Sequence, residues 1–350
     1  PASMKNILKM ALTIPVIKNI KKYKKILLGL LIFFVAVFVF ETFIPNSLFA
    51  KEAITYDVEK GVGGEDVAKD LYEIGVVKSP FFFKLYAVLT GNHGKIQAGK
   101  YEISPSMSTA EIIKKMSLGQ TIKERITILE GWDLEDIAKH LESKNLYSKE
   151  DFLSITNQDF SNEFAVLSDK PNSVSIEGYI FPDTYYVSYE EGIDDLIKTA
   201  LANFSSKLDE QMRSDIILQK KSVFKVITMA SILEKEANNY KDKKIIAGIL
   251  WKRIEEGVPL QVDATVNYVT GRSDPKVAIK DTKIDSPYNT YKYYGLPKGP
   301  ISNPGLDSIL AAIYPESSEF WYYLSADGTG ETIYSKTFDE HLDAQRKYFN

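Results

Sequence analysis

The chain contains no cysteine and only three histidines among its 350 residues. Without cysteine it can form neither disulfide bonds nor thiolate metal sites. The histidines, His93, His140 and His341, lie far apart and show no HxxxH or HExxH spacing. Such spacings are typical of zinc ligands, so we expect no metal site and no cofactor. A histidine-dependent catalytic triad would rest on a single candidate residue.

The chain also lacks an excess of charge of either sign, because 43 basic residues face 47 acidic residues and give a formal net charge of −4. This near balance gives no indication of a nucleic-acid partner. Tyrosine, in contrast, is abundant, with 21 residues. Its apolar ring and polar hydroxyl are suited to binding a sugar or to lining a hydrated groove. The length allows about two or three domains with a real core.

Acidic residues are absent from the segment 4–25, which contains seven lysines. Residues 1–3 precede Met4 and are interpreted as the remnant of a tag. An uncharged apolar run then extends from Ile26 to Phe40 and continues to Ile44, with Glu41 as its only charge. Its length is close to the ~20 residues that cross a bilayer.

The apolar run 26–44 fits either an uncleaved membrane anchor or a cleaved signal peptide. The long lysine-rich leader, and the lack of a small-x-small cleavage motif in the segment 46–50, favour the anchor. The positive-inside rule then places residues 1–25 in the cytoplasm. We therefore predict a single-pass protein of the cell membrane whose residues from about 45 onward lie outside the cytoplasm.

A repeat with an offset of seventy residues follows the predicted anchor. The sequences VEKG (58–61) and EDVAK (65–69) recur without a gap as ILEG (128–131) and EDIAK (135–139). Each copy predicts a strand, a glycine turn and a short helix. After the first copy, residues 99–103 alternate as a strand does, and Ser108 and Glu111 form a capping-box pattern that predicts a helix.

The region 45–125 is therefore predicted to be a small strand–helix–helix–strand module. Such modules resemble LysM modules, which bind glycans containing N-acetylglucosamine; a structural spacer is the alternative. We predict that residues 126–175 form a second strand–helix unit and a linker. The main domain boundary is expected where the pattern weakens, before the catalytic domain at 176–350.

The segment 222–239 predicts a core helix, because its apolar residues recur at helical spacing. One row comprises Val223, Val226, Ile227, Ala230, Leu233 and Ala237, and a second row comprises Met229 and Ile232. Only Thr228, Ser231 and Lys235 are left as a predicted solvent-exposed strip.

Two carboxylates, Glu234 and Glu236, lie in the last turn of this helix and off that strip. Residues two apart point to opposite sides of a helix, so the pair cannot act as one dyad. A carboxyl that projects from an apolar surface is poorly solvated. This raises its pKa and suits it to general acid catalysis. The alternative is that one glutamate pairs within the core and the other reaches water at the helix end.

Other polar candidates lie in segments on either side of this helix. Glu177 precedes a glycine in the aromatic segment 176–186. The segment 257–271 predicts either a strand with Gln261, Asp263 and Thr265 on one face, or a helix capped by Asp263 that ends at Gly271. We favour the helix, and in both cases Gln261 and Asp263 mark an exposed polar edge.

The segment 286–305 is predicted to be a stiff loop, because it holds three glycines, four prolines and four tyrosines. Its residues Tyr288, Asn289, Thr290 and Tyr291 offer the rings and amide groups that would bind an acetamido sugar. A structural loop tied down by its own tyrosines is equally consistent with the sequence.

Five motifs occur in a fixed order: EGYIFPDTYY (177–186), MASILEKE (229–236), LQVDATVNY (260–268), SPYNTY (286–291) and GLPKGPISNPG (295–305). This set resembles the endolytic murein transglycosylase family, also called YceG-like proteins, from the anchor to the end of the chain. The resemblance implies an α+β fold: a single N-terminal transmembrane helix, a small LysM-like module, and a mixed α+β catalytic domain with a lysozyme-like helical core. One departure is Ala264, where many members carry proline.

The resemblance also implies roles for individual residues. Glu236 is expected to be the catalytic acid and Glu234 a supporting residue. The expected substrate-binding residues are Gln261, Asp263, Thr265, Tyr288, Asn289, Thr290, Tyr291, Glu177 and Asn303.

The activity implied is cleavage of the β-1,4 bond between N-acetylmuramic acid and N-acetylglucosamine within peptidoglycan glycan strands. The products would carry 1,6-anhydro ends, and the cleavage would terminate nascent strands. Association with peptidoglycan synthases in the membrane is implied as well. Two other classes remain open: a lysozyme-like hydrolase using Glu236 with Asp263, and a non-catalytic glycan-binding membrane protein.

Overall fold

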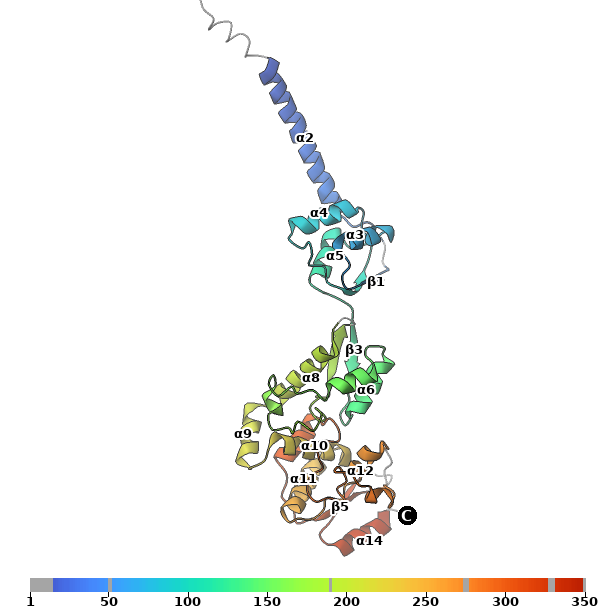
Figure 1. Ribbon diagram of the computed structural model, residues 1–350, viewed down its shortest axis with the longest axis vertical. Helices are drawn as coiled ribbons and strands as arrows, with labels where there is room; N and C mark the ends of the chain where they lie inside the picture. Colours follow the sequence, from blue (N-terminus) through green and yellow to red (C-terminus); the bar gives the residue numbers. More distant parts are fainter. Residues whose placement is uncertain (1–14, 50–51, 189–190, 273–276, 327–330, 349–350) are drawn as a thin grey trace, which may run out of the picture. The chain divides into compact units, whose positions relative to one another are not determined.

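The computed structural model describes residues 15–49, 52–188, 191–272, 277–326 and 331–348, and these form a mostly helical α+β protein (Figure 1). The α+β class is as predicted. The chain divides into two compact units: residues 1–124 with 188–190, and residues 125–187 with 191–350. Residues 126–175, predicted to be a separate unit and linker, thus fall in the same unit as residues 191–350.

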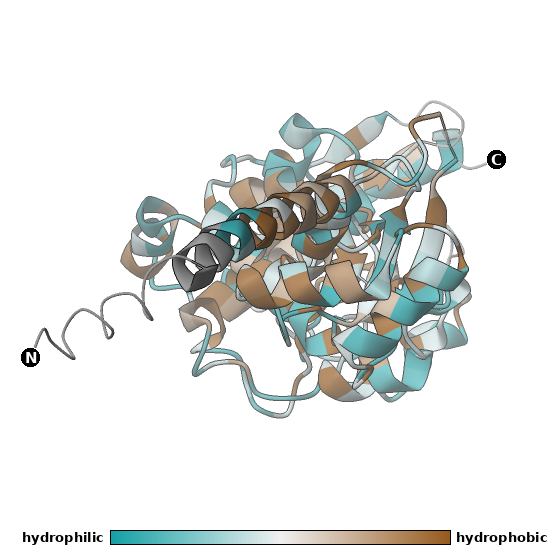
Figure 2. Ribbon diagram, turned by 90° about the horizontal axis from the view of Figure 1, so that it is seen from above, coloured by the Kyte–Doolittle hydropathy of each residue, from teal (hydrophilic) through white to brown (hydrophobic). Residues whose placement is uncertain are grey.

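The first helix of the first unit is α2 (Pro15–Phe43). Its portion Lys22–Phe43 is long and apolar enough to cross a membrane, and it covers the predicted apolar run 26–44 except for Ile44. Hardly any of this portion is buried, which distinguishes it from the core helix of a soluble protein. Figure 2 shows the change from hydrophilic to hydrophobic residues along α2.

The rest of the first unit has the predicted order of elements. It comprises β1 (Ile54–Val58), α3 (Gly64–Glu73), α4 (Pro80–Leu89), β2 (Gly99–Ile103) and α5 (Thr109–Ser117). The two strands pair in antiparallel fashion, with Tyr56 opposite Tyr101. The capping box of Ser108 and Glu111 at the start of α5 is present, as predicted.

The second copy of the repeat begins the second unit with the same order of elements. These are β3 (Lys123–Thr127), α6 (Leu134–Ser143), α7 (Lys149–Ile155), β4 (Thr184–Ser188) and α8 (Ile193–Lys207). The backbone repeats as well: Gly61 and Gly131 have φ angles of 90° and 79°, and Gly75 and Asn145 have φ angles of 74° and 53°. Left-handed backbone at matching positions explains why the turn residues recur.

The remaining elements complete the second unit. They are the short helix Ala165–Leu167, α9 (Glu210–Leu218), α10 (Val223–Glu236), α11 (Tyr240–Glu255), α12 (Asp263–Thr270), the short helix Asp281–Lys283, α13 (Leu306–Ile313), β5 (Tyr322–Ser325), β6 (Thr332–Ser335) and α14 (Phe338–Tyr348). Strands β5 and β6 pair in antiparallel fashion, as a hairpin requires. The glycines of the segment 327–330 predict the turn of this hairpin, and the segment lies outside the described residues.

The core helix of the second unit is α10, and it is more deeply buried than its sequence predicts. Thr228 and Ser231, predicted to face solvent, are both 0% exposed. Ser231 Oγ accepts a hydrogen bond from Ile301 N at 3.0 Å, and Ser302 Oγ donates to Ser231 O at 3.0 Å. The loop that contains GLPKGPISNPG therefore packs directly on α10, and only Lys235 of the predicted strip is exposed.

Of the two interpretations of segment 257–271, the helix is correct, since α12 ends at Gly271 with a φ angle of 64°. The cap is one residue earlier than predicted. Val262 is the N-cap residue, and Asp263 is the first residue of the helix. A carboxylate in the first turn favours the helix electrostatically, so Asp263 lies where the helix dipole stabilises its charge.

Candidate active site

Glu236 is the last residue of α10, and its side chain lines a pocket of the second unit. Its Oε2 accepts a hydrogen bond from Tyr323 Oη of β5 at 2.9 Å. Burial raises the pKa of the Glu236 carboxyl to about 7, the hydrogen bond from Tyr323 lowers this pKa, and the negative charge of Asp263 raises it. A carboxyl with such a pKa can hold and release a proton near neutral pH.

The pocket has a volume of about 380 Å³. It is lined by Asp133, Glu135, Asp136, Lys139, Lys235, Glu236, Asp263, Ala264, Asn267, Tyr268, Gly271, Arg272 and Ile301. Residues of α6, α10, α12 and the 295–305 loop therefore meet in one cavity. Such a concave site with a few convergent polar groups is the usual form of a binding site.

Asp263 lines the same pocket as Glu236, whereas Gln261, predicted to share a polar edge with Asp263, does not. Its Oδ1 accepts a hydrogen bond from Tyr291 Oη at 2.5 Å, and its Oδ2 accepts one from Val277 N at 3.5 Å. The carboxylate is thus held in place by Tyr291 of the predicted stiff loop. Since Asp263 also raises the pKa of Glu236, the two carboxyls are electrostatically linked.

Glu234 lies on the other side of α10, away from the pocket. Lys243 Nζ of α11 donates to its Oε1 at 3.1 Å, and the two side chains are 8% (Glu234) and 4% (Lys243) exposed. Its Oε2 accepts hydrogen bonds from Gly305 N at 2.9 Å and Ser308 Oγ at 2.6 Å, at the start of α13. The separation of Glu234 from Glu236, predicted from their spacing, is confirmed by these contacts.

Glu177 is a third carboxyl of this unit, and it is almost completely buried beside the pocket. Leu134 N at the start of α6 and Asn303 Nδ2 each donate to it at 3.0 Å. Tyr268, which lines the pocket, donates to Glu177 Oε2 at 3.5 Å. Burial raises the pKa of Glu177 to about 8. Glu177 thereby links α6, α12 and the 295–305 loop, three segments that line the pocket.

Four of the predicted substrate-binding residues, Asn303, Asn289, Thr290 and Thr265, are at most 1% exposed. Asn303 Oδ1 accepts from Ile180 N, and Asn289 Nδ2 donates to Thr282 O and Ile284 O. The hydroxyls of Thr265 and Thr290 lie 2.9 Å apart. In this structure these side chains bind the protein's own backbone and one another, so they shape the loop that carries Tyr291.

The two remaining predicted residues differ in their surroundings. Tyr288 is partly buried, and its ring lies 5.0 Å from that of Tyr268. Gln261 is exposed, does not line the pocket, and has a φ angle of 54°. A positive φ angle is uncommon for a residue other than glycine, and it accompanies the hydrogen bond from Gln261 N to Thr290 O.

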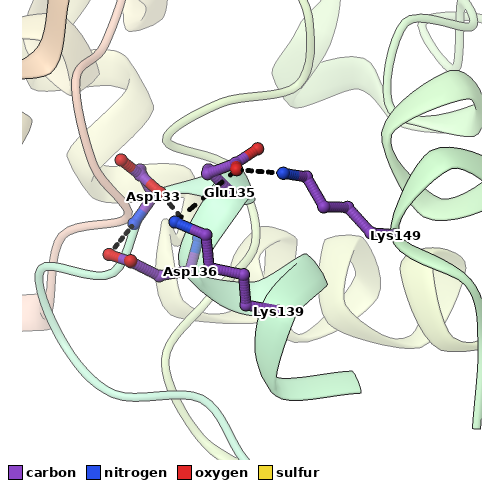
Figure 3. A network of polar contacts seen from close by, with 5 residues as sticks. All are labelled: Asp133, Glu135, Asp136, Lys139 and Lys149. Atoms are coloured by element: carbon purple, nitrogen blue, oxygen red, sulfur yellow. Dashed lines mark hydrogen bonds and ion pairs between the residues drawn. The ribbon is translucent and has the colours of Figure 1, made fainter. Parts of the chain in front are cut away.

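Sequence reasoning missed several residues of the pocket. Tyr268 and Arg272 were not predicted, nor were Asp133 and the charged residues of α6, which Figure 3 shows together with Lys149 of α7. Tyr323, which donates a hydrogen bond to Glu236, was not predicted as a site residue either. Among the residues of Figure 3, Asp133 and Asp136 form the capping box of α6, and Glu135 pairs with Lys139 and Lys149. The acidic first turn is visible in the sequence, but nothing there indicates that it meets α10.

A carboxyl with a raised pKa in a pocket can supply the proton for cleavage of a glycosidic bond, and a second carboxylate beside it is what hydrolysis of that bond would use. Helical packing and this site thus define a candidate glycan-cleaving enzyme. The sequence model of the YceG-like family matches residues 56–347, and the chain belongs to this family.

Three relatives illustrate the similarity. The endolytic murein transglycosylase of Bacillus subtilis is 34% identical over 86% of both chains. That of Streptococcus pneumoniae D39 is 28% identical over 87% of this chain, which spans 60% of that protein's length. The crystal structure of a YceG-like protein from Listeria monocytogenes is 34% identical, covers 84% of this chain and 99% of its own, and aligns with a TM-score of 0.59.

Proposed function

We propose that the chain is a membrane-anchored lytic transglycosylase that cleaves peptidoglycan glycan strands internally. The observation that carries this proposal is Glu236, a carboxyl with a pKa near neutrality that faces a pocket large enough for sugar rings. The names of the family relatives support the same activity. The bond attacked would be the β-1,4 link between N-acetylmuramic acid and N-acetylglucosamine.

The reaction needs one proton donor and no water. The Glu236 carboxyl gives its proton to the glycosidic oxygen as the bond from that oxygen to the anomeric carbon breaks. The resulting carboxylate then takes the proton of the sugar's own 6-hydroxyl while the 6-oxygen bonds to the anomeric carbon. Glu236 ends protonated, and the product carries a 1,6-anhydro-N-acetylmuramic acid end.

Asp263 would tune Glu236 in this mechanism, because its charge raises the pKa of the acid. Its hydrogen bond from Tyr291 supports a positioning role. A lysozyme-like hydrolase is the second candidate, since two carboxylates in one pocket are also what hydrolysis uses. Mass spectrometry of the fragments distinguishes the two: anhydro ends are one water lighter than the reducing ends that a hydrolase would release.

The pH dependence of cleavage should report on Glu236. Activity is expected to fall as the pH rises through about 7, because the acid must be protonated. Asp263→Asn should move this limb to lower pH by removing a charge that raises the pKa. Tyr323→Phe should move it to higher pH by removing a hydrogen bond that lowers the pKa. Profiles of kcat/KM for the three proteins test this, and shifts in the same direction would contradict it.

Membrane anchoring through α2 is the second part of the proposal. Lysines precede the apolar portion of α2 and the rest of the chain follows it, which supports a cytoplasmic N-terminus. A protease added outside intact spheroplasts should therefore degrade residues from about 45 onward and spare the leader. Protection of the C-terminal part would reverse the orientation.

Three finer assignments belong to the same proposal. The β1–α3–α4–β2 order of the first unit supports a LysM-like, glycan-binding module. The second unit would have a lysozyme-like helical core around α10. Cleavage beside the membrane would suit termination of nascent strands near peptidoglycan synthases.

Among the predicted binding residues, Tyr288 and Gln261 would orient acetamido groups of the strand. The buried Glu177, Thr265, Asn289, Thr290 and Asn303 would act by holding Tyr291, Tyr268 and α6 in position.

A further inference from the structure

Helix α4 exposes a continuous apolar face within the described part of its unit. Phe81, Val88 and Leu89 are 61%, 53% and 67% exposed, and Leu85 between them is partly exposed. The spacing i, i+4, i+7, i+8 places these four residues on one side of the helix. Single exposed apolar residues are ordinary, whereas a contiguous row marks an interaction surface.

A second face of α4 packs against α2. The ring of Phe82 lies 6.1 Å from that of Phe34 and 6.2 Å from that of Phe38. The ring of Tyr86 lies 5.6 Å from that of Phe43. Helix α4 therefore runs alongside α2 from Phe34 to Phe43, a stretch of roughly 14 Å at the helical rise of about 1.5 Å per residue.

Lys78 lies beside the C-terminal part of α2, at Phe40. Lys78 Nζ donates to Phe40 O at 3.2 Å and lies 3.6 Å from the centroid of the Phe40 ring. Lysines at the ends of membrane helices reach toward the headgroup region in this way. Phe34 lies six residues before Phe40, or roughly 9 Å deeper along the helix. Phe82, which contacts Phe34, is therefore below the level of Lys78.

The charge of α4 is compatible with such a position. The helix contains one charged residue, Lys84, and no acid. The ammonium of Lys84 is paired with Glu65 Oε2 of α3 at 2.6 Å. The acids near α4 belong to other helices, Glu41 to α2 and Glu65 and Asp66 to α3, so the row of Phe81, Leu85, Val88 and Leu89 carries no charge of its own.

We propose that α4 is an interfacial helix that inserts Phe81, Leu85, Val88 and Leu89 into the lipid leaflet at the C-terminal end of α2. This inference rests on the membrane anchoring proposed above. Lipid is the expected occupant because the exposed row lies beside the last third of α2, whose own apolar side chains are exposed and would be surrounded by acyl chains. Interfacial helices bury their apolar face about 5–10 Å into the headgroup and acyl boundary, which matches the depth of Phe82. The first unit would then be held against the membrane rather than tethered at a distance.

The absence of cysteine makes the test direct, because a single introduced cysteine can be labelled with an environment-sensitive fluorophore. Full-length Phe81→Cys and Leu89→Cys would be reconstituted in vesicles with and without lipids that carry a quencher on the acyl chain. Val35→Cys in α2 reports on the anchor, and Asp57→Cys reports on β1, which Figure 1 draws at the end of this unit away from α2. We expect quenching at Val35, Phe81 and Leu89 and none at Asp57.

The possible outcomes separate the two proposals. Quenching at Val35 without quenching at Phe81 and Leu89 would leave the anchor intact and overturn the interfacial helix. Absence of quenching at Val35 would overturn the anchor and the interfacial helix together. Emission at Phe81 that is shifted to the blue but not quenched by lipid would show that a protein surface covers α4, which also overturns the proposal.

Charge substitutions on α4 test insertion directly, and the same substitutions on α9 are the matched control. With the fluorophore at Val88→Cys, the pair Phe81→Glu and Leu89→Glu should reduce lipid quenching several-fold by repelling the helix from the acyl region. The pair Ile217→Glu and Leu218→Glu makes the same change at residues of α9 that are 72% and 79% exposed. This control should leave quenching unchanged, and a near-UV circular dichroism spectrum confirms that each variant is folded. Equal quenching in both pairs would contradict insertion.

Discussion

Replacing Glu236 by glutamine is expected to lower the rate of glycan-strand cleavage by at least ~10²-fold, the usual contribution of a general acid. Glutamine keeps the shape of the side chain and can still accept the hydrogen bond from Tyr323 Oη. It has no proton to give to the glycosidic oxygen, so the bond would break without assistance. The measurement is the initial rate at which soluble fragments with anhydro ends are released from isolated peptidoglycan.

The matched control is Glu130→Gln. The pKa of Glu130 is also raised, first by burial and then by the charge of Glu234, but this residue does not line the pocket. Its substitution should leave cleavage close to the wild-type rate. Full activity of Glu236→Gln would remove Glu236 from the mechanism. If Glu234→Gln were inactive while folded, the proton donor would instead be Glu234.

Glu236→Gln should not destabilise the fold. A loss of activity in this variant can therefore be distinguished from unfolding. The pKa of Glu236 rises from the ordinary 4.5 to about 7 on folding, so the folded state binds this proton more tightly. Stability from this group is present below pH 4.5 and is lost as the pH rises through about 7. Glu236→Gln should therefore melt at or above the wild-type temperature at pH 8, with a smaller difference at pH 5.

Much of the structure around Glu236, and of the repeated strand–helix units, follows from short-range sequence patterns. Apolar periodicity predicted α10, and the spacing of two residues predicted that Glu234 and Glu236 diverge. The seventy-residue repeat predicted matching strands and helices, and its turn residues share left-handed backbone. These features depend on residues within one or two turns of each other, where periodicity and turn chemistry determine the structure.

Features that depend on packing between distant segments could not be predicted in the same way. Thr228 and Ser231 look like a solvent-exposed strip, but the 295–305 loop covers it and bonds to Ser231 Oγ. The acidic N-terminal end of α6 lines the pocket, although it precedes Glu236 by about a hundred residues in the sequence. Tyr323 of β5 supplies the hydrogen bond to the proposed acid from a segment about ninety residues further along the chain. No local pattern encodes which of these segments meet.

The buried position of Lys243 also depends on packing between distant segments. It leads to the second large expected effect, on stability. Glu234→Ala should lower the free energy of unfolding of the second unit by roughly 3–5 kcal/mol, the usual cost of breaking a buried ion pair. The change leaves the Lys243 ammonium, 4% exposed, without its carboxylate, and it removes the acceptor of Gly305 N and Ser308 Oγ. All three tryptophans, Trp132, Trp251 and Trp321, lie in this unit, so their fluorescence during urea unfolding measures the effect.

A double variant tests whether the unpaired charge is the cause. Glu234→Gln with Lys243→Met removes both charges, and glutamine can still accept from Ser308 Oγ or Gly305 N, so it should recover most of the lost stability. Cleavage per folded molecule should then remain well above that of Glu236→Gln, because the Glu234 pair supports α13 and stays outside the pocket. A stable double variant without activity would contradict this division, since it would place Glu234 in the chemistry instead of the scaffold. Recovered stability with retained cleavage would leave Glu236 as the carboxyl that acts on the strand.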